Sequence, residues 1–133
     1  MLVYLDSNIV IYLIEQPALW GPRARSRVAA LRSNHDEIVA SDLTRMECRI
    51  RPTATGDAQG LALFDSFFSS SDVRVVGLTP SVCDRATIIR ATHGLKPMDA
   101  LHVAAAVENR CDLFITNDTR LSGFPDIKVE VLP

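Results

Sequence analysis

Apolar residues recur along this chain in two patterns, short continuous runs and longer stretches with helical spacing. A short apolar run that turn residues enclose is typical of a buried strand. The runs predict strands at residues 2–5, 38–40, 73–78, 113–116 and 128–132, the last of them at the edge of a sheet.

The stretches between these runs have the spacing and the end signals of helices. Asp6, Ser41 and Thr79 are cap-type residues at helix starts, Pro80 follows Thr79 at the first helical position, and Gly94 stands at a helix end. We expect residues 52–60 to be a loop or a helix boundary. Helices are predicted over about 7–15, 22–32, 42–51, 61–68, 80–93 and 98–109.

Strands that alternate with helices predict an α/β fold with a mostly parallel sheet of four or five strands. Because parallel sheets are buried on both sides, helices should cover both faces, in three layers. The helix over 98–109 is apolar nearly all round, which is typical of a buried helix. No repeat or linker interrupts the pattern, so residues 1–133 are expected to form one domain.

The composition fits an ordinary globular domain, with 47% hydrophobic and 23% charged residues in 133. No stretch is apolar and long enough to span a bilayer, and the first apolar run lacks a basic leader and contains Asp6. We therefore expect a cytoplasmic protein without membrane contact. Cys48, Cys83 and Cys111 are scattered and odd in number, which predicts buried free thiols rather than disulfides or a zinc site.

Four acidic residues stand out by their place relative to the strands. Asp6 follows the first strand, Asp118 lies two residues past the fourth, and Glu47 lies on the helix that the second strand feeds. Parallel strands place their carboxyl ends along one edge, where α/β sheets bind ligands, so these three side chains can converge there. Asp99 lies in the first turn of the buried helix.

Each acid has a simple structural interpretation when it is taken alone. Asp6 and Asp118 can cap helices, Asp99 can favour a helix dipole, and Glu47 can reach solvent or pair with Arg51. Their joint placement favours another hypothesis, because gathered like charges repel and their desolvation is costly. That hypothesis is a divalent-metal site.

Oxygen ligands alone favour Mg²⁺ or Mn²⁺. Such ions activate water for phosphodiester cleavage. Residues beside the acids can orient ligands or water, namely Ser7, Asn8, Thr116 and Asn117. The net charge is −2, and the chain without the four acids carries +2, so the metal-loaded protein would present a mildly basic surface.

Four motifs together resemble the PIN-domain family, and more closely the VapC toxins of type II (VapBC) toxin–antitoxin systems. They are the strand before Asp6-Ser7-Asn8, then S-D-L-T-R-M-E-C-R, K-P-M-D-A-L-H-V-A-A-A and F-I-T-N-D, in order over almost the whole chain. The resemblance implies a PIN-like α/β/α domain and a metal-dependent endoribonuclease. It implies that Asp6, Glu47, Asp99 and Asp118 hold the metal and are catalytic, and that Thr116 is the hydroxyl residue before the last acid.

The resemblance also implies partners. These are an RNA substrate such as transfer or ribosomal RNA, a cognate VapB-type antitoxin, a homodimer, and a heterotetramer or larger assembly with the antitoxin. The chain departs from many relatives at Arg120, where another acid is common. Arg120 can instead contact substrate phosphate, and Arg45 and Arg49, which flank Glu47, are further candidates for RNA contacts.

Two other functions stay open at this point. Asp6 can serve as the nucleophile of a phosphotransfer or phosphatase domain, although the D-x-D motif common in such sites is here Asp6-Ser7-Asn8. The chain can also be a non-catalytic interaction module that keeps the PIN fold. His102 can act as a base or a ligand, but a structural role is favoured, because metal-activated water needs no separate histidine base.

Overall fold

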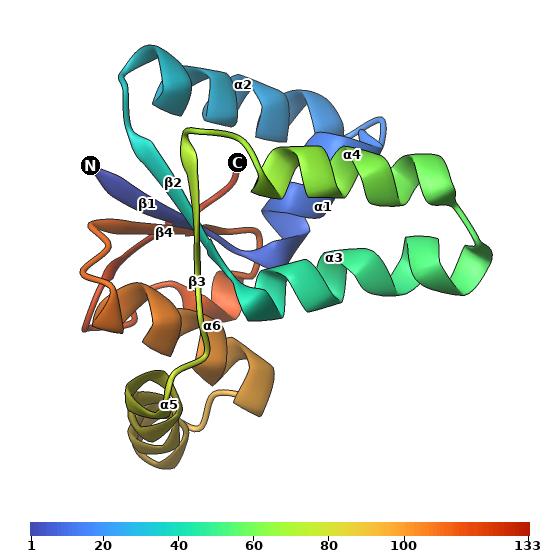
Figure 1. Ribbon diagram of the computed structural model, residues 1–133. Coiled ribbons are helices and arrows are strands. Elements are labelled where there is room, and N and C mark those ends of the chain that lie inside the picture. The colour runs from blue at the N-terminus through green and yellow to red at the C-terminus, as the bar shows by residue number, and fades with distance from the viewer.

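A parallel sheet of five strands forms the centre of the computed structural model, which describes residues 1–133 (Figure 1). The strand order is β3-β2-β1-β4-β5, with every neighbouring pair parallel. The α/β fold class, the parallel sheet and the edge position of the last strand are therefore confirmed. The strands are β1 (Leu2–Leu5), β2 (Glu37–Ser41), β3 (Val73–Val76), β4 (Leu113–Thr116) and β5 (Lys128–Val131).

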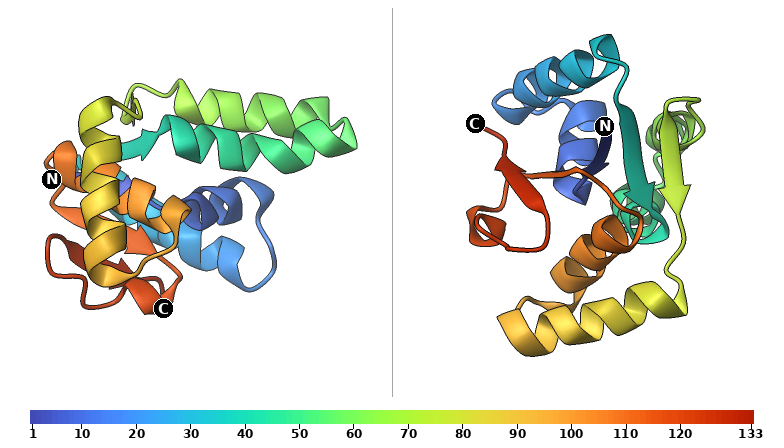
Figure 2. Two further views of the ribbon diagram at one scale, coloured as in Figure 1. Left: turned by 90° about the horizontal axis from the view of Figure 1, so that it is seen from below. Right: turned by 90° about the vertical axis from the view of Figure 1, so that its left-hand side faces the viewer.

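Helices cover both faces of this sheet (Figure 2). One face packs against α1, α2 and α4, with Cys48 of α3 in the same core, and the other packs against α5 and α6. The helices are α1 (Ser7–Glu15), α2 (Trp20–Ser33), α3 (Asp42–Thr55), α4 (Ala58–Phe68), α5 (Pro80–His93) and α6 (Pro97–Glu108), with a 3₁₀ turn η1 (Thr119–Leu121).

The three central strands, β2, β1 and β4, are mostly apolar because both of their faces are buried. In β1, Val3 and Leu5 belong to the core under α1 and α2, whereas Tyr4 belongs to the core under α5 and α6. All three side chains are fully buried. α6 is also buried, as its sequence predicts, and it supplies five alanine and valine side chains and His102 to the interior.

The α3–α4 segment differs from the prediction. Residues 52–55 continue α3, which ends only where Gly56 adopts the left-handed conformation (φ 69°). Pro52 lies inside the helix and is buried, so tertiary packing outweighs its lost backbone donor. The two helices form a hairpin that projects beyond the sheet (Figure 1).

The thiols also differ from the expectation. All three cysteines are free, but only Cys48 is buried, while Cys111 is half-buried and Cys83 is exposed on α5. None of the helices combines the length and the apolar character needed to cross a membrane.

Candidate functional site

Asp6 lies directly after β1 and caps α1, and both of its carboxylate oxygens accept hydrogen bonds. Oδ1 accepts from the Ser7 amide at 2.8 Å, and Oδ2 accepts from the Thr116 hydroxyl at 2.8 Å. The residue is 8% exposed, so its orientation is fixed by two neighbours while one side still reaches solvent. A carboxylate held in this way is pre-oriented for a ligand.

Thr116 links two of the acids at the end of β4. Its hydroxyl donates to Asp6 and accepts from the Asp118 amide at 3.0 Å. Beside it, the Asn8 amide donates to the Asn117 side chain at 3.1 Å. The adjacent carboxyl ends of β1 and β4 therefore bring Asp6 and Asp118 to the same edge, as the sheet argument predicts, with Asn8 and Asn117 beside them.

Glu47 reaches the same edge from α3. Its Oε1 accepts from the Ser7 hydroxyl at 2.8 Å and from His102 Nε2. Its Oε2 makes no hydrogen bond, and because no buried side-chain oxygen lacks a partner, this atom is open to solvent. Burial acts to raise the pKa of Glu47, but the His102 and Ser7 hydrogen bonds outweigh it and lower that pKa. The pairing of Glu47 with Arg51 is not observed, since Arg51 approaches Glu15.

Asp99 is the acid without a partner. It lies half-buried in the first turn of α6, and no protein group donates a hydrogen bond to it. Burial, and then the negative charges of Asp6 and Asp118, raise the pKa of Asp99 above its ordinary value. Three acids are therefore close enough for their charges to interact.

Asp118 is neutralised by its neighbour. Arg120 Nε lies 2.9 Å from Oδ1, and Arg120 Nη2 lies 2.6 Å from Oδ2. This guanidinium fork lowers the pKa of Asp118. Arg120 is itself exposed, so a competing cation can reach the same carboxylate from solvent.

The arrangement is an acidic edge rather than a closed metal cage. No three His, Cys, Asp or Glu side chains approach closely enough to enclose an ion. The donor set nevertheless fits a hard cation, because it consists of carboxylate oxygens and Asp99 makes no ion pair or hydrogen bond with a protein group. Asp6, Asp99 and the open Oε2 of Glu47 are available to an ion, whereas Asp118 must first leave Arg120.

His102 is the residue whose contacts sequence reasoning undervalued. It is 2% exposed, and it touches Tyr4 and Ser7 as well as Glu47. Its Nε2 also lies 3.9 Å from Asp6 Oδ1. The available signal was a polar residue three positions after Asp99 on a helix that is otherwise buried and apolar.

The other candidate arginines are engaged in ion pairs on the α3 surface. Arg49 lies 2.8 Å from Asp65, and Arg45 lies 3.8 Å from Asp42. Both pairs are well exposed, and exposed pairs contribute little stability. Either arginine can therefore exchange its partner for a phosphate.

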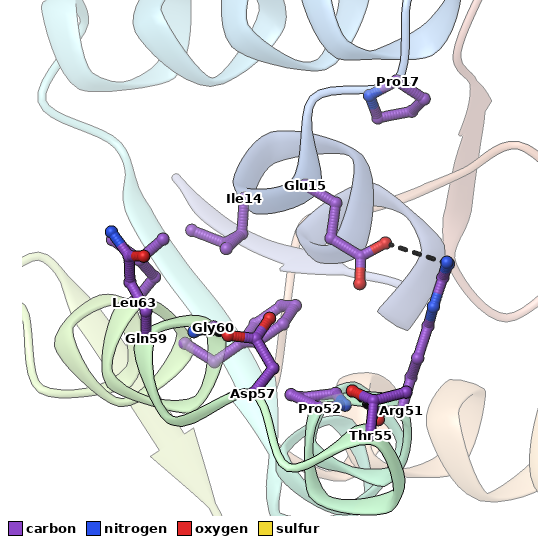
Figure 3. Close-up of a pocket in the computed structure, with 11 residues that line it drawn as sticks. Ile14, Glu15, Pro17, Arg51, Pro52, Thr55, Asp57, Gln59, Gly60 and Leu63 are labelled. Atoms are coloured by element: carbon purple, nitrogen blue, oxygen red, sulfur yellow. Dashed lines mark hydrogen bonds and ion pairs between the residues drawn. The ribbon is translucent and has the colours of Figure 1, made fainter.

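The larger clefts of the surface lie away from the acids. One of about 580 Å³ opens between the end of α1 and the α3–α4 hairpin (Figure 3). Ile14, Pro52 and Leu63 line it, and the Glu15–Arg51 pair lies across its mouth at 3.6 Å. None of the four acids lines one of these larger clefts.

Comparison with known proteins places this geometry in context. The sequence model of the PIN domain matches residues 3–127. No curated protein sequence matches the chain.

Several solved structures share the fold over nearly the whole length. DNA-bound VapBC2 from Rickettsia felis has a TM-score of 0.80 at 18% identity, and DNA-bound VapBC from Salmonella typhimurium has 0.78 at 22%, each with 100% of both chains covered. VapC20 from Mycobacterium tuberculosis, described as a toxin that cleaves the sarcin–ricin loop, has a TM-score of 0.75 at 14% identity, with 96% of this chain and 98% of that chain covered. At these identities the likeness concerns the fold.

Proposed function

The chain belongs to the PIN-domain family, and from this membership we propose that it is a Mg²⁺- or Mn²⁺-dependent endoribonuclease, the toxin of a type II toxin–antitoxin system. The observation that carries the proposal is Asp99, a half-buried carboxylate without a hydrogen-bond donor, facing the charges of Asp6 and Asp118. Such a group is costly unless a cation is its partner. The acidic edge is therefore the proposed metal and catalytic site.

Each acid has its own part in this proposal. Asp6, fixed by Ser7 and Thr116, and the unpartnered Asp99 would bind the ion directly. Glu47 would add Oε2, and Asp118 would join when Arg120 releases it. The bound ion would supply a water nucleophile at neutral pH and stabilise negative charge on the phosphate.

Arginines around the edge would hold the RNA. Arg120, once free of Asp118, carries a guanidinium fork suited to the scissile phosphate. Arg45 and Arg49 would contact the backbone on the α3 side. Ser7, Asn8, Thr116 and Asn117 would keep ligands and water oriented through the hydrogen bonds described above.

The proposed partners follow from the similar structures, two of which are DNA-bound VapBC assemblies and a third of which is described as a toxin–antitoxin complex from Klebsiella pneumoniae. We expect a homodimer that binds a cognate VapB-type antitoxin in a heterotetramer or larger complex. RNA, including transfer or ribosomal RNA, would be the substrate, and the cytoplasm its place of action. The domain is proposed to span residues 1–133.

The alternatives are less well supported. A phosphotransfer site of this kind commonly has a second acid two residues after the nucleophile, but the residue two positions after Asp6 is Asn8, which contacts Asn117. In a non-catalytic module, the unpartnered carboxylate of Asp99 next to two other acids would be an uncompensated cost.

The test is RNA cleavage by Asp6→Asn and Asp99→Asn in the presence of Mg²⁺ or Mn²⁺. We expect each to lose at least about 100-fold in cleavage rate while circular dichroism shows a folded protein, since even outer-shell changes at metal sites cost 10–100-fold. The matched control is Asp84→Asn, an exposed aspartate on α5 without an ion pair. Metal-dependent cleavage at the wild-type rate by both site variants would contradict the proposal.

A further inference from the structure

A chain of polar side chains runs through the interior from the sheet to Glu47. Tyr4 is fully buried in β1, and its hydroxyl lies 2.8 Å from His102 Nδ1 and 2.8 Å from the Ser41 hydroxyl. The other ring nitrogen, Nε2, contacts Glu47 Oε1. A proposed ligand of the site is thus connected to residues that never reach the surface.

The chemistry of the partners assigns the protons on the His102 ring. An ionised carboxylate only accepts, so Nε2 must carry the proton that it donates to Glu47. In the neutral imidazole Nδ1 then accepts, and the Tyr4 hydroxyl is the group it faces. A phenol has one proton, so when Tyr4 donates it to Nδ1 the Ser41 hydroxyl, 2.8 Å away, donates to Tyr4 in return. Burial raises the pKa of Tyr4 well above its ordinary value, so the phenol keeps its proton.

This network fixes the orientation of the Glu47 carboxylate and leaves its Oε2 without a hydrogen bond. Both hydrogen bonds to the carboxylate, from Ser7 and from His102, end on Oε1. Oε2 stays open to solvent. The contrast with Asp118 is informative, because Arg120 engages both oxygens of that residue.

We infer that Tyr4 and His102 are positioning residues that hold Oε1 of Glu47, so that Oε2 is presented to the metal ion and its water. The inference rests on the proposed function of the acidic edge. Ligands at metal sites are commonly oriented by outer partners in this way. Here the partner of Glu47 is itself fixed by a second buried hydrogen bond, from Tyr4.

The first experiment measures Mn²⁺ binding by isothermal titration calorimetry. His102→Leu should weaken binding by about 10-fold or more, because Glu47 loses its anchor. His102→Gln keeps a hydrogen-bond donor for Oε1. Its Mn²⁺ affinity should therefore stay within about threefold of the wild type, a smaller change than the 10-fold or more that loss of such a partner causes. His93→Gln, an exposed histidine on α5, is the matched control.

The second experiment observes the ring directly in the metal-free protein. Two-bond ¹H–¹⁵N correlation spectra should show His102 as the tautomer protonated at Nε2, with Nδ1 accepting a hydrogen bond that disappears in Tyr4→Phe. Tyr4→Phe should also weaken Mn²⁺ binding several-fold. If His102→Leu does not fold, the tautomer of His102 and the Mn²⁺ affinity of Tyr4→Phe still test the inference.

Three results would overturn the inference. They are a wild-type ring protonated at Nδ1 alone, unchanged Mn²⁺ affinity in a folded His102→Leu protein, and higher affinity in that variant, which would make His102 a competitor of the metal. Failure of the proposed function is distinguishable. A wild-type protein that binds Mn²⁺ but cleaves no RNA contradicts the ribonuclease proposal alone, whereas one that binds no Mn²⁺ overturns both.

Discussion

At the scale of single residues, Arg120 gives this site a cation of its own. It is bound to both oxygens of Asp118 at the position where the PIN-domain resemblance leads one to expect an acid. A metal ion that uses Asp118 must therefore displace a guanidinium. The same guanidinium, once displaced, becomes available to a phosphate, so one residue would oppose metal binding and assist substrate binding.

This dual role predicts opposite effects of one substitution. Arg120→Gln should increase the affinity for Mn²⁺ several-fold, because Asp118 is free, while kcat/KM for RNA cleavage falls because a phosphate contact is lost. Calorimetry and cleavage kinetics measure the two effects separately. Arg32→Gln is the matched control, since Arg32 also pairs with an aspartate, Asp72, away from the site. Equal or weaker Mn²⁺ binding by Arg120→Gln would exclude Asp118 as a ligand.

Asp99 predicts a pH dependence of stability. Because the folded metal-free protein raises the pKa of this carboxyl, ionisation opposes folding, so the cost is absent below the unfolded-state pKa and grows as pH rises through the folded-state pKa. Asp99→Asn should therefore be more stable than the wild type at pH 7 without metal. The advantage should vanish as pH falls below the ordinary aspartate range.

Thermal unfolding in a chelating buffer across pH 3–8 checks this expectation. The control is Asp84→Asn, which removes an exposed aspartate of α5 and should show no such advantage. A wild type that is more stable than Asp99→Asn at pH 7 without metal would show that the carboxylate has a stabilising partner.

The sequence predicted individual residues best where the signal was local. The caps at Asp6, Ser41 and Thr79 are present because each depends only on the next few residues. Glu47 was assigned to the edge but not to its partner, since His102 lies 55 residues away and meets it only after α3 and α6 pack. The Asp118–Arg120 pair spans only two residues, yet it was not predicted, because Arg120 was considered only as a contact for substrate phosphate.

At the scale of elements, the pattern predicted every strand and helix but not every boundary. Pro52 was expected to end a helix because it lacks a backbone donor, yet α3 continues for three residues beyond it. Burial of Pro52 is a tertiary effect that a local rule omits. α2 begins two residues before Pro22, where the first-turn amides need no partner in any case.

The turn between α5 and α6 sets the start of the helix that carries Asp99, and it depends on a glycine. Gly94 has φ 68°, and a Cβ there would meet no atom within 4 Å, so only backbone strain opposes a larger residue. Gly94→Ala should therefore cost about 1 kcal/mol of unfolding free energy. Denaturant unfolding measures the loss.

Gly77→Ala provides the comparison for this substitution. Gly77 lies outside the left-handed region, and an added Cβ would stay 3.8 Å from the Asp42 carboxylate, an ordinary contact. We expect a change within about 0.5 kcal/mol there. Equal losses at the two glycines would mean that backbone conformation is not what Gly94 contributes.

At the scale of the whole molecule, one sheet separates two cores, and its carboxyl edge gathers the polar chemistry of both sides. The core under α1 and α2 fixes Asp6 through the start of α1, while the core under α5 and α6 delivers Asp99 and His102. A ligand that bridges these acids connects elements from opposite faces of the sheet. Binding at this edge should therefore stabilise the fold as a unit rather than one helix.

Metal-linked unfolding tests that expectation. At a free Mn²⁺ concentration of 100 times its Kd, the unfolding free energy should rise by about 2.7 kcal/mol, provided that the unfolded chain does not bind the ion. The rise should be absent in Asp6→Asn, where the central carboxylate is lost, and in Arg120→Gln it should appear at lower Mn²⁺ concentration. Thermal melts over a Mn²⁺ series measure all three proteins. Stabilisation of Asp6→Asn equal to that of the wild type would place the binding site elsewhere on the molecule, because Asp6 is the residue through which Thr116, Ser7 and the strand ends are joined.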